Sequence, residues 1–501
     1  MRRGDRIDVI AGARIGGEGR ELLAHPDYDV DGVYDVWLDG DRIVDIAPAG
    51  AIRHRGAVLD AGGAWLVPGL WDHHVHTLEH ALARGTVSVE EAASSRDAAR
   101  AALAAPVRSD GRRVVARLRE GLWDEPAELA VLDEVTGEVP TYLVSADLHS
   151  VWMNTAALRR EGVATDGSGL VREGVAFAIE QRLKHLPAED EDRALDGALE
   201  EAAARGVVGV QDLEMAWNAD RWRRRLARGH DVTRVRFDAY PDDLDRVIAE
   251  GLLTGDALDG SPLVEFGMLK VISDGSLGTR TAATSGPYAD GSSRGRLNAD
   301  PRALLELVTR AAAAGIVTTI HAIGDVANRH ALDAFAAADV PGRIEHAQLV
   351  TRTDIARFAR LNVEASIQPE HALDDRELVA AEWSAQTAVA YPLREFVDAG
   401  ANVLLGSDAP VTPLDPWIQM SAAVFRARSG EEPWRADQGI DSATALAAAT
   451  AGGSANGSRI LPGEVADLVL VEHDPLAASA EQLRGMPVHA TLLAGRLTHL
   501  A

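Results

Sequence analysis

The chain has 501 residues, 46% of them hydrophobic and 25% charged, so it can bury a large core and is not globally disordered. Its formal charge of −27 gives a surface that repels phosphate backbones and anionic membranes. No cysteine is present, which excludes disulfides, thiolate metal ligands and cysteine catalysis. Any metal ion must therefore be held by nitrogen and oxygen atoms.

Both ends of the chain carry short β-strand patterns. Residues 33–50 alternate apolar and polar side chains around an Asp-Gly turn, which predicts a hairpin. Residues 466–476 and 489–500 are two further short β-rich segments near the end of the chain. We expect one small β-sandwich that is assembled from residues 1–64 and 455–501.

The middle of the chain, residues 65–454, alternates short strands rich in Val and Ile with helical stretches rich in Ala, Leu and Arg. This rhythm is typical of βαβ units in a parallel sheet. The eight strand-like segments are residues 65–76, 205–213, 233–240, 267–275, 315–325, 343–348, 362–369 and 401–408. They predict an α/β fold with a (β/α)8 TIM-type barrel, and no Gly-x-Gly-x-x-Gly motif supports a dinucleotide site.

The connection between the first two of these strands is anomalous. It covers residues 77–205, far more than an ordinary βα loop. The segment contains helical stretches and one strand-like segment, residues 141–149. We expect an insertion subdomain on the catalytic face of the barrel, where it would shape the substrate pocket.

The clearest chemical signal is the sequence PGLWDHHVH at residues 68–76. His74 and His76 lie two apart on a strand, so their imidazoles share one face and can reach one metal ion. His73 points to the opposite face, whereas Asp72 could orient a ligand from behind. His-x-His alone could equally be an incidental pair.

Three more candidates close later strands, namely His321, His346 and Asp408. A single histidine at a strand end is more often a structural, hydrogen-bonded residue. Four histidines and an aspartate at the carboxyl ends of strands in one barrel instead predict a metal cage with room for water.

These motifs resemble the amidohydrolase superfamily. Several segments resemble its amidohydrolase-3 branch, which includes N-substituted formamide deformylases; they are residues 140–158, 269–283, 321–328, 343–350 and 366–371. The resemblance implies that His74 and His76 bind a first metal, and that His321 and His346 bind a second metal or complete the first site. It also implies that Asp408 binds metal and handles protons, with His346 as a second catalytic candidate.

Lys270 is one of only two lysines in the chain, the other being Lys184. Many superfamily members carbamylate a lysine in the fourth barrel strand, and the carbamate bridges two metals. This chemistry needs an amine that can lose its proton, which arginine cannot supply. The simpler alternative is a lysine that pairs with an acidic neighbour such as Asp274.

Asp274 and Arg280, which follow the fourth strand, and Gln368 and His371, which follow the seventh, are candidate substrate-binding residues. The expected function is hydrolysis of a non-peptide C–N bond, amide- or formamide-like, by attack of metal-activated hydroxide. The alternatives are a mononuclear deaminase of a heterocycle and a non-catalytic barrel scaffold.

The expected cofactor is one or two divalent ions, with zinc as the working choice. The expected partner is a small-molecule substrate, with no nucleic-acid or membrane partner. The N-terminus lacks an uninterrupted apolar segment that would serve as a secretory signal, and we expect a cytoplasmic protein. We take a homodimer as the working assembly.

Overall fold

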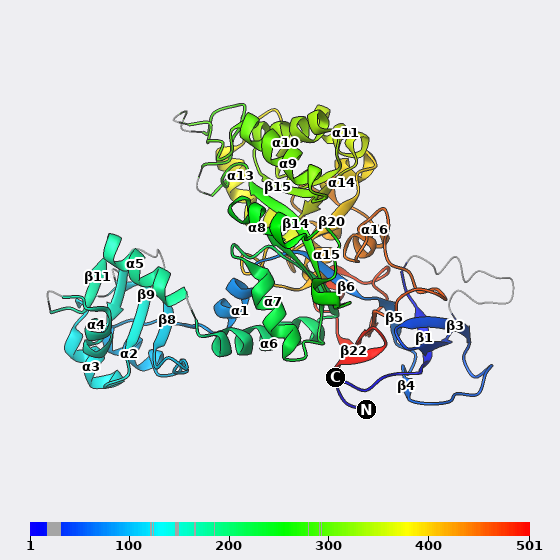
Figure 1. Ribbon diagram of the computed structural model, residues 1–501, viewed down its shortest axis with the longest axis horizontal. Helices are drawn as coiled ribbons and strands as arrows, with labels where there is room; N and C mark the ends of the chain where they lie inside the picture. Colours follow the sequence, from blue (N-terminus) through cyan, green and yellow to red (C-terminus); the bar gives the residue numbers. More distant parts are fainter. Residues whose placement is uncertain are drawn as a thin grey trace. The chain divides into compact units, whose positions relative to one another are not determined.

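The structure, a computed structural model, describes residues 1–17, 32–120, 123, 125–145, 150–164, 167–184, 186–278, 280–289, 291 and 293–501. The chain forms two compact units (Figure 1). One consists of Met1–Thr77 together with Leu199–Ala501, and the other of Leu78–Ala198. Within the part of the chain that the structure describes, no helix is both long enough and apolar enough to cross a membrane.

The larger unit contains an eight-stranded parallel sheet in the order β20-β18-β16-β15-β14-β13-β12-β6. Its strands are β6 (Leu70–Val75), β12 (Val207–Asp212), β13 (Arg234–Ala239), β14 (Val264–Ile272), β15 (Thr318–Ala322), β16 (Gly342–His346), β18 (Val363–Ile367) and β20 (Val403–Leu405). Each lies within one of the eight predicted segments or overlaps it. The sequence prediction of an α/β barrel is therefore confirmed.

The two edge strands of this sheet, β6 and β20, approach each other just beyond their carboxyl ends. Val75 forms a parallel bridge with Ala409. The amide of Asp408 donates to the carbonyl of His74 at 2.7 Å, and the amide of His76 donates to the carbonyl of Ala409 at 2.9 Å. The barrel is thus nearly closed, and its seam lies beside the predicted metal ligands.

Helices lie between the strands in the sequence, and most of them pack on the outer face of the barrel (Figure 1). They are α6 (Ala188–Ala204), α7 (Asn218–Ala227), α8 (Leu244–Glu250), α9 (Pro301–Ala313), α10 (Asp325–Ala338), α11 (Arg352–Leu361), α12 (Pro369–Asp374), α13 (Arg376–Glu382), α14 (Leu393–Asp398), α15 (Pro416–Phe425) and α16 (Ser442–Ala448). Outward side chains such as Phe237, Ile320 and Ile344 form one apolar core with these helices, except α12 and α13, whose Ala372 and Val379 belong to a separate apolar cluster. Because side chains alternate along a strand, the residues between them point into the barrel.

A second sheet uses both ends of the chain, in the order β23-β22-β21-β5-β1-β2-β3, with β4 beside β1. Its strands are β1 (Val9–Ile15), β2 (Tyr34–Asp39), β3 (Arg42–Pro48), β4 (Val58–Asp60), β5 (Trp65–Pro68), β21 (Leu468–Val471), β22 (Val488–Leu493) and β23 (Arg496–Leu500). Gly69 alone separates β5 from β6. A Cβ there would come within 2.5 Å of the Val208 side chain, so the close approach requires glycine.

The unit Leu78–Ala198 has its own sheet, in the order β11-β10-β9-β8-β7, and its own apolar clusters. Its strands are β7 (Val87–Ser88), β8 (Arg113–Leu118), β9 (Thr141–Ser145), β10 (Ser150–Met153) and β11 (Leu170–Arg172). Its helices are α2 (Ser95–Ala102), α3 (Leu129–Thr136), α4 (Thr155–Glu161) and α5 (Glu173–Lys184), and α1 (Thr77–Gly85) leads into it. The role of this insertion at the substrate pocket stays a prediction.

Candidate metal centre

The predicted imidazole and carboxylate ligands come from four places around the barrel and meet at the carboxyl ends of its strands. His74 lies in β6 and His76 directly follows it; His321 lies in β15, His346 ends β16, and Asp408 follows β20. His74, His346 and Asp408 each offer one ligand atom, and these atoms lie within 4.8 Å of one another. Residues that are far apart in the sequence therefore form one compact cluster.

Asp408 is in contact with three imidazoles. Its Oδ1 lies 3.2 Å from Nε2 of His74 and 3.4 Å from Nε2 of His76, and its Oδ2 lies 3.7 Å from Nε2 of His371. The ring of His346 lies 4.8 Å from that of His74 and 4.5 Å from that of His321, measured between centroids. This spacing brings every predicted histidine ligand into the cluster.

Burial keeps most of the cluster in the form that binds metal. It lowers the pKa of His321 to about 3 and that of His346 well below its usual value, so both imidazoles stay neutral. Nδ1 of His346 is buried and lacks a hydrogen-bond partner among the described residues. A neutral imidazole with a free nitrogen is a good ligand for a divalent cation.

The same cluster favours a positive charge at its centre. Burial and Lys270 oppose protonation of His74, but Asp408 and Glu345 outweigh them and raise its pKa. Burial alone would raise the pKa of Asp408, yet His74 and His76 hold it well below its usual value. A carboxylate among imidazoles is a set of nitrogen and oxygen donors, and the residues present fit a divalent metal.

The backbone is strained where the chain presents these ligands. His346, Ala347 and Asp408 have φ angles of 74°, 42° and 57°, in the left-handed region that non-glycine residues avoid. His346 is in register with Ala322, whose side chain faces the outer core. The left-handed backbone explains how the ring of His346 still joins the cluster. Such strain costs about 1–3 kcal/mol per residue and is typical of functional sites.

Lys270 lies in β14 and is only 2% exposed. Its Nζ lacks a hydrogen-bond partner among the described residues. Burial lowers the pKa of this amine, against the opposing effect of Glu345, Asp408 and Asp238. No hydrogen bond or ion pair joins Lys270 to Asp274 among the described residues, and the acidic groups that act on Lys270 are Glu345, Asp408 and Asp238.

Asp274 is wholly buried and organises the loops around it. Its carboxylate accepts hydrogen bonds from the amides of Ala283, Ile323 and Gly324 at 2.9–3.0 Å. Burial raises its pKa to about 7, partly offset by these amides. Oδ1 also lies 3.6 Å from Nε2 of His321, so Asp274 supports a predicted ligand from behind.

The other predicted substrate-binding residues divide into two groups. Gln368 and His371 are buried against the cluster: Nε2 of Gln368 lies 3.4 Å from Nδ1 of His74, and the ring of His371 stacks on His346 at 6.1 Å. Arg280 instead forms an ion pair with Glu382 at 2.6 Å, and its side chain is half-exposed. Substrate contact by these residues stays a prediction.

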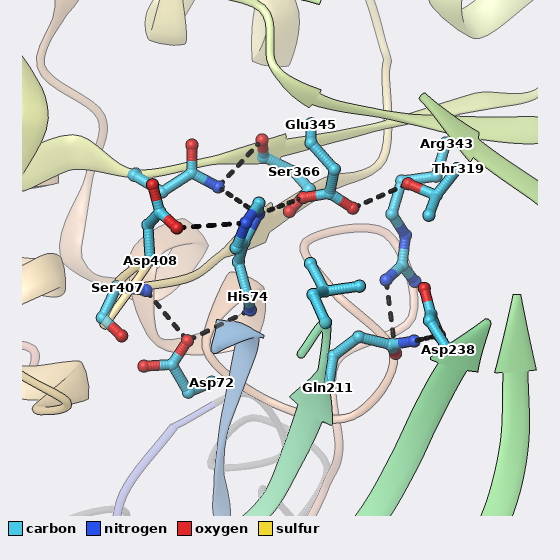
Figure 2. Close-up of polar contacts among 12 residues, drawn as sticks. Asp72, His74, Gln211, Asp238, Thr319, Arg343, Glu345, Ser366, Ser407 and Asp408 are labelled. Atoms are coloured by element: carbon cyan, nitrogen blue, oxygen red, sulfur yellow. Dashed lines mark hydrogen bonds and ion pairs between the residues drawn. The ribbon is translucent and has the colours of Figure 1, made fainter. Parts of the chain in front are cut away.

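Glu345 was missed by the sequence analysis, and Asp72 acts differently from the expectation. Oε2 of Glu345 lies 2.8 Å from Nδ1 of His74 (Figure 2).

Asp72 does not reach a histidine ring; its Oδ1 accepts hydrogen bonds from the amides of His74 and Ser407 at 3.1 Å and 2.8 Å. Asp72 therefore links β6 to the backbone that follows β20, where the barrel closes. His73 points away, as predicted, and its Nε2 contacts the carbonyl of Thr450.

A nearly closed parallel barrel with imidazoles and a carboxylate at its carboxyl ends defines a metal-dependent hydrolase. The model of the amidohydrolase family matches residues 57–499. The chain therefore belongs to the amidohydrolase family, and it is a hydrolase that acts on carbon–nitrogen bonds.

Two curated relatives align along most of their length. The putative amidohydrolase YtcJ of Bacillus subtilis is 25% identical over 483 residues, covering 88% of this chain and 90% of the relative. The N-substituted formamide deformylase of Arthrobacter pascens is 25% identical over 542 residues, covering 93% and 94%. An uncharacterized metal-dependent hydrolase from Pyrococcus horikoshii has a similar fold, with a TM-score of 0.80, 22% identity, and coverage of 94% of this chain and 99% of that one.

Proposed function

We propose that this protein hydrolyses an amide- or formamide-like, non-peptide C–N bond of a small molecule, with zinc as the metal. The observation that supports the proposal is the contact of Asp408 with His74 and His76 beside the rings of His321 and His346. The relationship to an N-substituted formamide deformylase favours a small amide over a heterocycle as the substrate.

We assign the metal to His74, His76, His321, His346 and Asp408, with Lys270 as an additional ligand once it is carbamylated. When bound, the metal supplies a Lewis acid that lowers the pKa of water and polarises the scissile carbonyl. Lys270 suits carbamylation because burial lowers the pKa of its amine. The amine attacks CO2, a C–N bond forms, and one proton is released.

Asp408 is the proposed proton carrier. Its Oδ1 lies beside two imidazoles and its Oδ2 beside His371, so the carboxylate is held within the cluster. It accepts the proton of the attacking water and delivers it to the leaving nitrogen. His346 and His371 flank this path, and their buried rings exclude bulk water from it. Gln368 is the proposed donor to the substrate carbonyl.

The test is hydrolysis by zinc-loaded protein of a panel of N-formyl amines, cyclic amides and aminated heterocycles. We expect the N-formyl amines to release an amine and formate and the cyclic amides to open to amino acids, with a loss of at least ~100-fold in His74→Ala and Asp408→Ala. Far-UV circular dichroism should show that both variants stay folded. Asp467→Asn is a matched control, because that carboxylate pairs with Arg234 at the start of β13, at the other end of the barrel.

Full activity in folded Asp408→Ala would refute the proton role. Ammonia release from heterocycles alone, with about one ion per chain, would instead favour a mononuclear deaminase. About two ions per chain would favour the site bridged by Lys270.

A further inference from the structure

Glu345 contacts the imidazole of His74 on the side away from Asp408. The carboxylate is fully buried in β16. Its Oε2 lies 2.8 Å from Nδ1 of His74, and its Oε1 accepts a hydrogen bond from Oγ1 of Thr319 at 2.8 Å. Both carboxylate oxygens therefore have fixed partners, and Figure 2 shows His74 between Glu345 and Asp408.

This contact determines which nitrogen of His74 carries hydrogen. An ionised carboxylate can only accept, so Nδ1 must donate to Glu345. The nitrogen left for a metal ion is then Nε2, which lies 3.2 Å from Oδ1 of Asp408 and would give up its own proton when the ion binds. The amide nitrogen of Gln368, 3.4 Å from Nδ1, is also a donor and cannot replace this acceptor.

The surroundings keep Glu345 in its ionised form. The basic side chains of Lys270 and Arg343 and the imidazole of His74 act electrostatically on this carboxylate and favour its negative charge. Arg343 pairs with Glu364 at 2.8 Å in the same barrel interior. A buried carboxylate is costly unless it is paired and hydrogen-bonded, and here it is both.

We propose that Glu345 is a positioning residue: it fixes the tautomer and ring orientation of His74 for metal binding, and Thr319 holds Glu345 in place. The inference rests on the proposed metal site of the preceding subsection. A carboxylate behind a ligating imidazole also makes the ring a stronger ligand. The simpler reading, a carboxylate that only balances Lys270 and Arg343, predicts an effect on stability and none on metal affinity.

The test compares Glu345→Gln, Thr319→Val, His74→Ala and the control Asp467→Asn with the wild-type protein. Affinity for Zn2+ is measured by competition with a chromophoric chelator, and the visible spectrum is recorded after substitution with Co2+. We expect Glu345→Gln to weaken Zn2+ binding by about 10- to 100-fold and to shift the Co2+ bands. Thr319→Val should weaken binding by several-fold, and Asp467→Asn should leave affinity and spectrum unchanged.

Wild-type affinity and spectrum in folded Glu345→Gln would overturn the inference, while weakened binding in His74→Ala would leave the proposed function intact. Wild-type affinity in His74→Ala would instead refute the metal site itself. If Glu345→Gln does not fold, Thr319→Val decides, because it keeps the charge and removes only the hydroxyl; unchanged affinity there overturns the inference. A lower melting temperature with unchanged affinity would indicate the purely structural role.

Discussion

At the residue scale, the unusual feature is how much charge the barrel interior holds beneath the metal cluster. Lys270, Arg343, Glu345 and Asp238 are all buried there. Each influences the pKa of at least one of the others. Figure 2 shows Arg343 and Asp238 joined through the side chain of Gln211. These charges compensate one another, so changing one of them has a predictable effect on the rest.

Lys270→Arg should lower the metal content of the purified protein. A guanidinium keeps its proton and cannot react with CO2, so no carbamate ligand can form. Metal per chain is measured by elemental analysis, with and without added bicarbonate. We expect bicarbonate to raise loading of the wild-type protein and of the control Lys184→Arg, but not of Lys270→Arg. Equal metal loading of all three proteins would show that no carbamate on Lys270 contributes to metal binding.

Asp238→Asn should change how stability depends on pH. Burial raises the pKa of Asp238 to about 7, against opposing contributions from the Met268 amide and Arg343, whereas the unfolded value is 3.8. Between these pH values the folded state holds a proton that the unfolded state has lost, so this group lowers the free energy of unfolding steadily from about pH 4 to about pH 7 and changes it no further above. The free energy of unfolding of Asp238→Asn, relative to that of wild type, should therefore rise by up to ~1.4 kcal/mol per pH unit from about pH 4 to 7. It should not change further above pH 7.

Urea unfolding of both proteins at pH 5, 6, 7 and 8 measures this difference. The substitution replaces Oδ2 with an amide NH2 group. Oδ2 lacks a hydrogen-bond partner among the described residues, so the buried NH2 group lowers stability by an amount that does not vary with pH. A difference in stability that stays constant across the series would contradict the raised pKa.

The sequence could predict the metal-site candidates because a histidine or aspartate at a strand end is visible as a residue type and a position. It could not predict Glu345. Period-2 alternation places only one of Glu345 and His346 inside the barrel, and the left-handed φ of His346 lets both contribute. The engagement of Asp274 with three amides, two of them from the next βα loop, was likewise invisible, because only the folded chain brings them together.

At the element scale, several helices and strands end in strained backbone. α10 ends at Asp339, an exposed residue with φ 53° and ψ 49° that caps the helix by donating its amide to Phe335. Left-handed geometry suits glycine, and an acidic side chain opposes the negative end of the helix dipole. Asp339 is therefore a locally unfavourable residue at a position where glycine would be favoured.

Asp339→Gly should raise the melting temperature by about 1–2 °C, from a gain of roughly 0.5–1 kcal/mol. Differential scanning calorimetry measures the shift. Ala336→Gly is the matched control, since it adds glycine at an exposed position inside the same helix and should destabilise by about 1 kcal/mol. A lower melting temperature for Asp339→Gly would show that its side chain makes a stabilising contribution outweighing the strain.

Element prediction succeeded where strands were apolar and failed where they were short. The barrel strands are buried on both faces and stand out as Val- and Ile-rich segments, so all eight were recognised. In the unit Leu78–Ala198 only residues 141–149 were identified as a strand, whereas the structure has a five-stranded sheet. β7 and β11 span two and three residues, which is too short for a period-2 pattern to register.

At the scale of the whole molecule, the metal cluster lies across the point where the barrel closes. His74 and His76 belong to its first strand region and Asp408 follows its last strand, while the described backbone contacts across this seam are few. Asp72 adds a bridge by accepting amides from both sides. A cation held by ligands from both sides would therefore join the ends of the sheet as well as serve chemistry.

Removal of the metal should consequently lower the stability of the unit Met1–Thr77 with Leu199–Ala501. A ligand at a hundred times its Kd stabilises the folded state by about 2.7 kcal/mol, so a chelator should lower the melting temperature and added Zn2+ should restore it. Scanning calorimetry of wild-type protein, Asp408→Ala and Asp467→Asn measures the shift. We expect the Zn2+-dependent shift in wild type and in Asp467→Asn. Asp408→Ala should not show it, because this variant lacks the metal ligand that follows β20. A full shift in Asp408→Ala would mean that the ion binds without bridging β6 and β20, and closure of the barrel would then depend on Asp72 and the backbone alone.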